Sequence, residues 1–293
     1  MQGLIIENAS NLYKVKVIEK VYTCTARGKM KQDDLQPVVG DFAEIEVLDE
    51  DKLEGVIEKV THRKTYIKRP KLANISQIVI VVSMKSPEPD LLLLDKQLAF
   101  ARYANINVVI VLNKIDLDTE KNYLKIAELY RKIGYKVFET NAKTGLGIDD
   151  LKMTLQNNKN AFAGNSGVGK STIINKICEK EVSLEGEISD KSQRGKNTTT
   201  VSRLFEINTG TYIADTPGFS TFDISEIHST DLDIYFREFR NFTGNCKYGN
   251  CSHIKEIVCG VKDALEEGHI SKQRYDNYVK IYNELREKEE NEW

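Results

Sequence analysis

The segment Ala161-Phe-Ala-Gly-Asn-Ser-Gly-Val-Gly-Lys-Ser-Thr-Ile-Ile-Asn-Lys-Ile-Cys178 decides the fold class of the central part of this chain. Within it, Gly164–Ser171 matches the phosphate-binding loop pattern G-x-x-x-x-G-K-[ST]. A short apolar run precedes the match and the helical pattern Lys170–Cys178 follows it, which is the strand–loop–helix context that this loop requires. The sequence therefore predicts a nucleotide-binding α/β domain.

Each residue type in this loop suits phosphate or Mg²⁺ binding for a chemical reason. The glycines let backbone N–H groups wrap around phosphates, and the helix N-terminus adds a partial positive charge. Lys170 would reach the β- and γ-phosphates, and the Ser171 hydroxyl would bind Mg²⁺. The residues expected to contact the nucleotide here are Gly164, Asn165, Ser166, Gly167, Val168, Gly169, Lys170, Ser171 and Thr172.

Two further motifs lie at the ends of strand-like runs. Asp215-Thr-Pro-Gly218 follows Tyr212–Ala214, and a carboxylate there suits the acid that holds Mg²⁺ through water. Alone, this tetrapeptide is most often an ordinary turn, but beside a phosphate-binding loop it indicates function. Asn113-Lys-Ile-Asp116 follows the strand-like run Asn107–Leu112, at the end of the strand where ligands of open α/β sheets collect.

Asp116 predicts which base the nucleotide carries. Its carboxylate can accept hydrogen bonds from the N1–H and the exocyclic amine of guanine, and adenine offers no such pair of donors. Asn141-Ala-Lys143, after the strand-like run Lys136–Thr140, would be the second loop that contacts the base. The expected base contacts are Asn113, Lys114, Ile115, Asp116, Asn141, Ala142 and Lys143.

The flanking regions differ from the central α/β pattern. Five short alternating runs in the first 65 residues indicate a small closed or half-closed β-barrel, with a small β domain of another type as the alternative. These runs are Leu4–Ile6, Tyr13–Val17, Val21–Thr25, Phe42–Val47 and Gly55–Val60. Beyond Thr221 the strand signal fades, and Leu232–Phe239 and Lys272–Arg286 have helical spacing.

The C-terminal region carries a cysteine–histidine cluster. Cys246-x₄-Cys251-x-His253-x₅-Cys259 supplies three thiolates and one imidazole, which close a tetrahedron around Zn²⁺ and leave no position for water. The site would therefore be structural. The alternative is a set of unligated cysteines, or a disulfide with a spare thiol, which a reducing compartment disfavours.

Composition limits the class of protein. Apolar residues make up 40% and charged residues 29%, which is the balance of a folded globular chain. No apolar run approaches the roughly 20 residues of a membrane span, and no signal peptide is recognisable, so we expect a cytoplasmic protein. The net charge of −2 excludes a uniformly basic nucleic-acid binder, although His62–Lys71 contains five Lys/Arg and no acid.

Taken together, these motifs resemble those of a known family. The four motifs resemble the Ras-type GTPase set, but Asn113–Asp116 and Asn141–Lys143 precede the phosphate-binding loop, which is a circularly permuted order. With its flanking regions, the chain resembles the ribosome small-subunit-dependent GTPases of the RsgA family over nearly all of its 293 residues. The implied organisation is an OB-fold RNA-binding domain (residues 1–65), a permuted GTPase domain (66–222) and a helical zinc-binding domain (223–293).

The resemblance also implies a switch segment, Arg194–Thr200, whose threonine completes the Mg²⁺ coordination. Thr199 is our choice, and Thr198 and Thr200 remain open. With Lys170, Thr199 would serve catalysis, and the Mg²⁺ ligands would be Ser171, Thr199 and Asp215. The family commonly has a histidine where this chain has Asn197, and Phe219 stands where Ras-type enzymes place a water-orienting glutamine. We therefore expect slow intrinsic hydrolysis, with a partner supplying the missing stabilisation of the transition state.

For RNA contacts, the resemblance points to the loop Arg27-Gly-Lys-Met-Lys31, with Arg27, Lys29 and Lys31 as the phosphate-binding residues. A solvated charged surface is the alternative. The implied function is GTP hydrolysis during late maturation of the small (30S) ribosomal subunit, with binding to its rRNA and release after hydrolysis. The expected ligands are GTP or GDP, Mg²⁺ and one structural Zn²⁺, and the expected partners are the subunit and other assembly factors of a monomeric protein.

Two other functions remain as alternatives. One is an RNA-binding assembly scaffold in which GTP is a static ligand, and the departures at Asn197 and Phe219 keep it open. The other is a permuted GTPase of the large subunit, which the barrel and the zinc segment disfavour.

Overall fold

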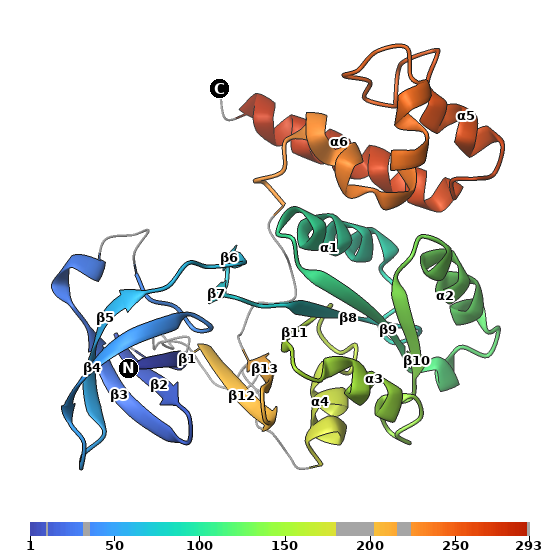
Figure 1. Ribbon diagram of the computed structural model, residues 1–293. Helices are drawn as coiled ribbons and strands as arrows, with labels where there is room; N and C mark the ends of the chain where they lie inside the picture. Colours follow the sequence, from blue (N-terminus) through green and yellow to red (C-terminus); the bar gives the residue numbers. More distant parts are fainter. Residues whose placement is uncertain (10, 32–35, 180–201, 216–223, 292–293) are drawn as a thin grey trace, which may run out of the picture. The chain divides into compact units, whose positions relative to one another are not determined.

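The computed structural model describes residues 1–9, 11–31, 36–179, 202–215 and 224–291 (Figure 1). The chain forms two compact units, each assembled from separate stretches of sequence. The first comprises Met1–Val79, Ile148–Ser166 and Lys170–Ser220. The second comprises Ile80–Gly147, Gly167–Gly169 and Thr221–Trp293.

The first unit begins with a five-stranded barrel. Its strands are β1 (Gln2–Ala9), β2 (Leu12–Val17), β3 (Lys20–Ala26), β4 (Phe42–Asp49) and β5 (Glu54–Val60). Strand β1 pairs antiparallel with both β2 and β4, and the parallel pair β3–β5 completes the closure. Alternate residues of each strand face inward, so Ile5, Tyr13, Tyr22 and Ile57 form a buried core. The predicted OB-fold barrel is confirmed.

The rest of the first unit is α/β. Its elements are β6 (Tyr66–Lys68), β7 (Lys71–Ala73), α3 (Ile148–Leu155), β11 (Lys159–Ala163), α4 (Lys170–Cys178), β12 (Ser202–Asn208) and β13 (Thr211–Asp215). Strand β11 pairs parallel with β13, and β13 pairs antiparallel with β12. Strand β12 pairs antiparallel with β1, so the sheet of this α/β part continues into the barrel. Strands β6 and β7 form a separate hairpin.

The second unit contains three strands in the order β10-β9-β8, where β8 is Gln77–Ser83 and enters from the first unit. Strands β9 (Asn107–Asn113) and β10 (Lys136–Thr140) are parallel. Helix α1 (Leu91–Tyr103) lies between β8 and β9 in the chain, and α2 (Asn122–Lys132) lies between β9 and β10. All of β8 and most of β9 are buried, as expected for a parallel sheet covered on both faces.

The C-terminal part of the second unit is helical. It contains the short 3₁₀ turns η4 (Ser229–Tyr235), η5 (Arg237–Asn241) and η6 (Thr243–Asn245), followed by α5 (Gly260–Glu266) and α6 (Lys272–Asn291). The long helix is confirmed, and its stripe Tyr278, Tyr282 and Leu285 lies in a buried cluster that also includes Ala99 of α1. Within the described ranges, no helix is long and apolar enough to cross a membrane.

The predicted helix Leu232–Phe239 is confirmed only in part, because the structure has two short 3₁₀ helices in place of one continuous helix. The chain there forms two 3₁₀ turns separated by Phe236, whose backbone is extended (φ −95°, ψ 96°). The extended backbone at Phe236 interrupts the helical hydrogen-bond ladder. The ring of Phe236 packs against Phe239 and Tyr278, with centroids 5.4 and 5.2 Å away. The apolar residues of this segment therefore recur at helical spacing because they are buried in the aromatic cluster, not because they form one continuous helix.

Candidate functional site

The start of the phosphate-binding loop and Asp215 emerge at one edge of the sheet in the first unit. Strands β11 and β13 are parallel neighbours, with Ala161 opposite Ala214. Strand β11 leads directly into Gly164, and Asp215 is the last residue of β13. Because the carboxyl ends of parallel strands meet at the same edge, the loop and the carboxylate lie where ligands of such sheets bind.

Lys170 begins α4 and its side chain folds back over the loop. Its Nζ donates to the carbonyl oxygens of Gly164 and Asn165, at 3.0 and 2.9 Å. These two residues open the loop, so the ammonium group already lies over the backbone that would hold phosphate. Ser171 and Thr172 follow in the first helical turn, and the N-terminus of a helix favours an anion.

In the second unit, the Asn113 side chain joins three loops. Asn113 is 1% exposed, and its Nδ2 donates to the carbonyl oxygen of Val168 at 2.9 Å. Its Oδ1 accepts from the backbone N–H of Ala142 and from Thr140 Oγ1, both at 3.1 Å. One buried amide therefore connects the Asn113–Asp116 loop, the Asn141–Lys143 loop and the middle of the phosphate-binding loop.

Lys114 and Gly169 continue this connection. Lys114 Nζ donates to the carbonyl of Gly167 at 2.6 Å and also to that of Ser86. Gly169 has a positive φ of +101°, and a Cβ there would come within 2.3 Å of Asn113 Nδ2. Glycine is therefore required at position 169 both for its backbone conformation and for the close approach of Asn113.

The two loops predicted to contact the base start side by side. Strands β9 and β10 are parallel, with Asn113 opposite Thr140, so their loops leave the same edge. Asp116 is exposed in the short turn η2 (Ile115–Leu117). Asn141 Oδ1 accepts from the backbone N–H groups of Lys143 and Thr144, at 3.1 and 3.3 Å, which fixes the second loop as an Asx turn.

The predicted switch residues lie outside the described part of the chain. This holds for Thr199, for its neighbours Thr198 and Thr200, and for Asn197 and Phe219.

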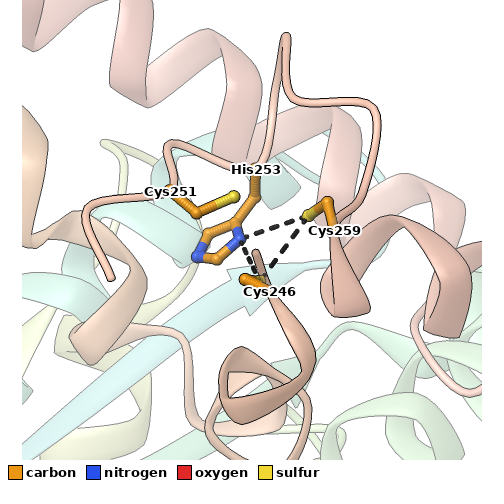
Figure 2. Close-up of side chains that lie close together, drawn as sticks. All are labelled: Cys246, Cys251, His253 and Cys259. Atoms are coloured by element: carbon orange, nitrogen blue, oxygen red, sulfur yellow. Dashed lines mark hydrogen bonds between the residues drawn. The ribbon is translucent and has the colours of Figure 1, made fainter. Parts of the chain in front are cut away.

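The four predicted zinc ligands converge, although they come from a loop of fourteen residues (Figure 2). Their ligand atoms all lie within 4.8 Å of one another. His253 Nδ1 is 3.5 Å from Cys246 Sγ and 3.4 Å from Cys259 Sγ, and the two sulfur atoms are 4.0 Å apart. Zinc bonds of about 2.3 Å to sulfur and 2.0 Å to nitrogen imply tetrahedral edges of about 3.5–3.8 Å. The donor set and its spacing fit Zn²⁺.

Burial affects the thiols of this cluster. It raises the pKa of Cys251 to about 12 and also raises the pKa of Cys259. Without a cation, these thiols therefore stay protonated, and a bound metal ion would have to displace their protons. His253 is buried at 2% exposure and presents Nδ1, not Nε2, to the sulfur atoms.

Three residues that the sequence analysis missed hold the histidine segment of the cluster. Asp233 Oδ2 lies 3.5 Å from His253 Nε2, on the side of the ring away from the thiols. Tyr275 and Tyr278 of α6 donate their hydroxyls to the backbone carbonyls of His253 and Ser252, at 2.7 and 2.9 Å. His253 has a left-handed backbone (φ 60°), which is rare outside glycine, and these contacts hold it there.

Comparison with known proteins agrees with this geometry. A family model described as the RsgA GTPase matches residues 60–225, and one described as the RsgA N-terminal domain matches residues 2–57. Together they cover the barrel and the motif-bearing region. The chain belongs to the RsgA GTPase family. It is therefore a GTP-hydrolysing enzyme, and its motif order is that of a circularly permuted GTPase.

Relatives in the RsgA family match along the full length. The small ribosomal subunit biogenesis GTPase RsgA of Clostridium botulinum (strain Eklund 17B / Type B) is 44% identical over 294 residues, covering 100% of both chains. The protein of the same name from Clostridium acetobutylicum is 44% identical over 285 residues, covering 97% of this chain and 98% of its own.

Two solved structures of high similarity share the fold. The structure of YjeQ from Thermotoga maritima superposes with a TM-score of 0.83 at 36% identity, covering 97% of this chain and 98% of the other. The structure of YloQ, described as a circularly permuted GTPase, has a TM-score of 0.81 at 31% identity, covering 98% and 95%.

The predicted RNA-binding residues of this RsgA-family chain lie on the barrel. Gly28–Lys31 forms a 3₁₀ turn after β3, and the side chains of Lys29 and Lys31 lie outside the described part. Arg27 forms ion pairs with Glu46 and Glu58 of neighbouring strands, at 3.0 and 2.6 Å. These pairs join different strands, so no local pattern in the sequence predicts them.

One cation of the basic stretch His62–Lys71 has a structural role. Arg63 binds the fully buried carboxylate of Asp41, at 2.8 and 2.9 Å to its two oxygens. It also donates to the carbonyl of Gln36. Arg63 therefore compensates a buried charge, and the other cations of the stretch carry its surface charge.

Proposed function

We propose that this GTPase acts in late maturation of the small ribosomal subunit, binds its rRNA and leaves after GTP hydrolysis. The two clostridial relatives, each 44% identical along nearly the whole chain, support the choice of subunit because both are small ribosomal subunit biogenesis GTPases by name. The proposed division is an RNA-binding barrel (residues 1–65), a permuted GTPase domain (66–222) and a zinc-binding region (223–293). The protein would act as a cytoplasmic monomer.

The observation that carries the nucleotide site is the hydrogen bond from Asn113 Nδ2 to the Val168 carbonyl. It connects a motif that comes early in the chain to the phosphate-binding loop 55 residues later, as the permuted order requires. In the proposed site, Gly164–Thr172 hold the phosphates and Asp116 with Asn141–Lys143 hold the guanine. Ser171, Asp215 and Thr199 hold Mg²⁺, and Lys170 stabilises the charge that develops on the phosphates.

Zinc would have a structural role in this protein. Cys246, Cys251, His253 and Cys259 supply four ligands and leave no open position for substrate. The ion would fix the loop between η6 and α5, which has little secondary structure of its own.

The barrel is the proposed RNA-binding part. OB-fold barrels bind oligonucleotides on a strand face and the adjoining loops. Arg27, Lys29 and Lys31 follow β3 in one such loop, and we propose that they meet phosphate. Other assembly factors are further proposed partners.

Steady-state GTP turnover tests this proposal, measured for the chain alone, with small subunits and with large subunits. We expect slow intrinsic turnover and a rise on the order of tenfold or more with small subunits only, because a partner completes the site. Turnover that small subunits leave unchanged, while the chain still binds them, would instead support the scaffold with a static nucleotide. Stimulation by large subunits alone would contradict the choice of subunit.

A further inference from the structure

Within the first unit, the barrel joins the hairpin β12–β13 through a short ladder. Glu7 of β1 lies opposite Arg203 of β12, and Asn8 lies opposite Ser202. Because backbone hydrogen bonds run from β1 through β12 to β13, the barrel and the hairpin are parts of one sheet.

The hairpin joins the two chain segments that carry the proposed Mg²⁺ ligands Thr199 and Asp215. Strand β12 begins at Ser202, directly after the segment that contains Thr199, and β13 ends at Asp215. In the antiparallel register Arg203 lies opposite Asp215. Both segments therefore attach to the same end of the hairpin, and that end is the one paired with the barrel.

Glu7, Arg203 and Asp215 form one row across three adjacent strands. Residues directly opposite each other on neighbouring strands project from the same face of a sheet. Arg203 Nε donates to Glu7 Oε2 at 2.8 Å, and Arg203 NH2 lies 2.8 Å from Glu7 Oε2. A residue of the barrel thus holds the residue that faces Asp215.

A second ion pair of opposite polarity holds the other end of the hairpin. Lys16 of β2 binds Glu206 of β12, and Glu206 also accepts the N–H of Gly210 at the hairpin turn, at 3.2 Å. The barrel thus supplies an anionic partner, Glu7, to Arg203 and a cationic partner, Lys16, to Glu206. A slip of three residues would place Glu206 near Glu7, so the two pairs also specify the register of the hairpin.

We propose that the Glu7–Arg203 pair is a positioning element that transmits engagement of the barrel to Asp215. The inference rests on the proposed function, because it takes the barrel as the RNA-binding part and Asp215 as a Mg²⁺ residue. RNA bound to the barrel fixes the β1–β12 ladder, and with it the hairpin end that carries Asp215. The two side chains are 22% and 45% exposed, so breaking the pair costs little folding stability.

Charge reversal tests this role in the full-length protein. GTP turnover and co-sedimentation are measured with purified small ribosomal subunits for Glu7→Arg, Arg203→Glu and the double reversal. Each single reversal should lower subunit-stimulated turnover at least about fivefold, the lower end of couplings between sites. Intrinsic turnover and subunit binding should stay near wild type, and the double reversal should restore stimulation. The control is Lys20→Glu, which breaks an exposed pair with Glu50 elsewhere on the barrel and should change nothing.

Three outcomes would overturn the inference. They are single reversals that keep full stimulation, a double reversal that fails to restore it, and a fall in intrinsic turnover as large as the fall in stimulated turnover. A wild-type protein that small subunits do not stimulate would instead refute the proposed function, which separates the two failures.

Discussion

Arg274 of α6 and Asp95 of α1 form a buried ion pair, with 2.5 Å between NH1 and Oδ1 and side chains 1% and 0% exposed. Asp95 also accepts from Asn277 and Tyr130, each at 2.7 Å. Arg274 also binds Glu238, at 2.7 and 3.0 Å. The network joins the C-terminal helix to a helix of the α/β part of the second unit. Because both charges are buried, each depends on its partners.

Arg274→Met should destabilise the protein strongly. It leaves Asp95 and Glu238 without their cation, and removing one partner of a buried pair typically costs about 3–5 kcal/mol. We expect a lower thermal midpoint and a smaller free energy of unfolding by urea titration. Lys272→Met is the matched control, because Lys272 forms an exposed pair with Asp276 one turn along the same helix. It should change stability by no more than about 0.5 kcal/mol. Equal effects of the two variants would contradict the structural role of Arg274.

Asp233→Ala should weaken zinc binding although Asp233 is not a ligand. Its carboxylate faces His253 Nε2 and would keep the Nδ1 atom directed at the metal. Loss of such an outer partner typically costs 10–100-fold in metal affinity. Competition with a chromogenic chelator measures the change.

Cys251→Ser, which removes a ligand, should lose the ion and destabilise the C-terminal region, because zinc-binding free energy is also folding free energy.

Elemental analysis sets the reference for these variants, with one zinc ion expected per wild-type chain. Protein that contains no zinc after purification without chelators would refute the metal centre. Wild-type affinity in Asp233→Ala would refute only the positioning role.

Asp116→Asn should change the choice of base. The carboxylate is proposed to accept two hydrogen bonds from guanine, and an amide cannot accept both. Binding of GTP should weaken and binding of xanthosine triphosphate should strengthen, as measured by fluorescent nucleotide displacement. If GTP binds the variant as tightly as it binds wild type, Asp116 does not read the base.

The features predicted best from the sequence depend on local chemistry. The phosphate-binding loop is contiguous, and the strands of the barrel follow from alternation of apolar residues within each run. The cluster of Cys246 with His253 also lies within one short segment. By contrast, the pairing of β1 with β12 joins residues 196 positions apart, as in Glu7 and Arg203, and no local pattern specifies it.

Side chains that act across elements were also missed. Asp233 lies 20 residues from His253, and Arg27 meets acids on two other strands, so neither role leaves a local sequence pattern. The segment Leu232–Phe239 was predicted as one helix because buried aromatic residues happen to recur at helical spacing. The extended backbone at Phe236 depends on tertiary packing with Tyr278, and propensity alone cannot predict it.

The proposed function requires that nucleotide state control how tightly the protein holds the small ribosomal subunit. Co-sedimentation with small subunits at fixed salt, in the presence of GDP or a non-hydrolysable GTP analogue, tests it most directly. A coupling of about 1–3 kcal/mol predicts that the GTP-analogue form binds about 5–150-fold more tightly than the GDP form. Equal affinity in the two nucleotide states would contradict the account.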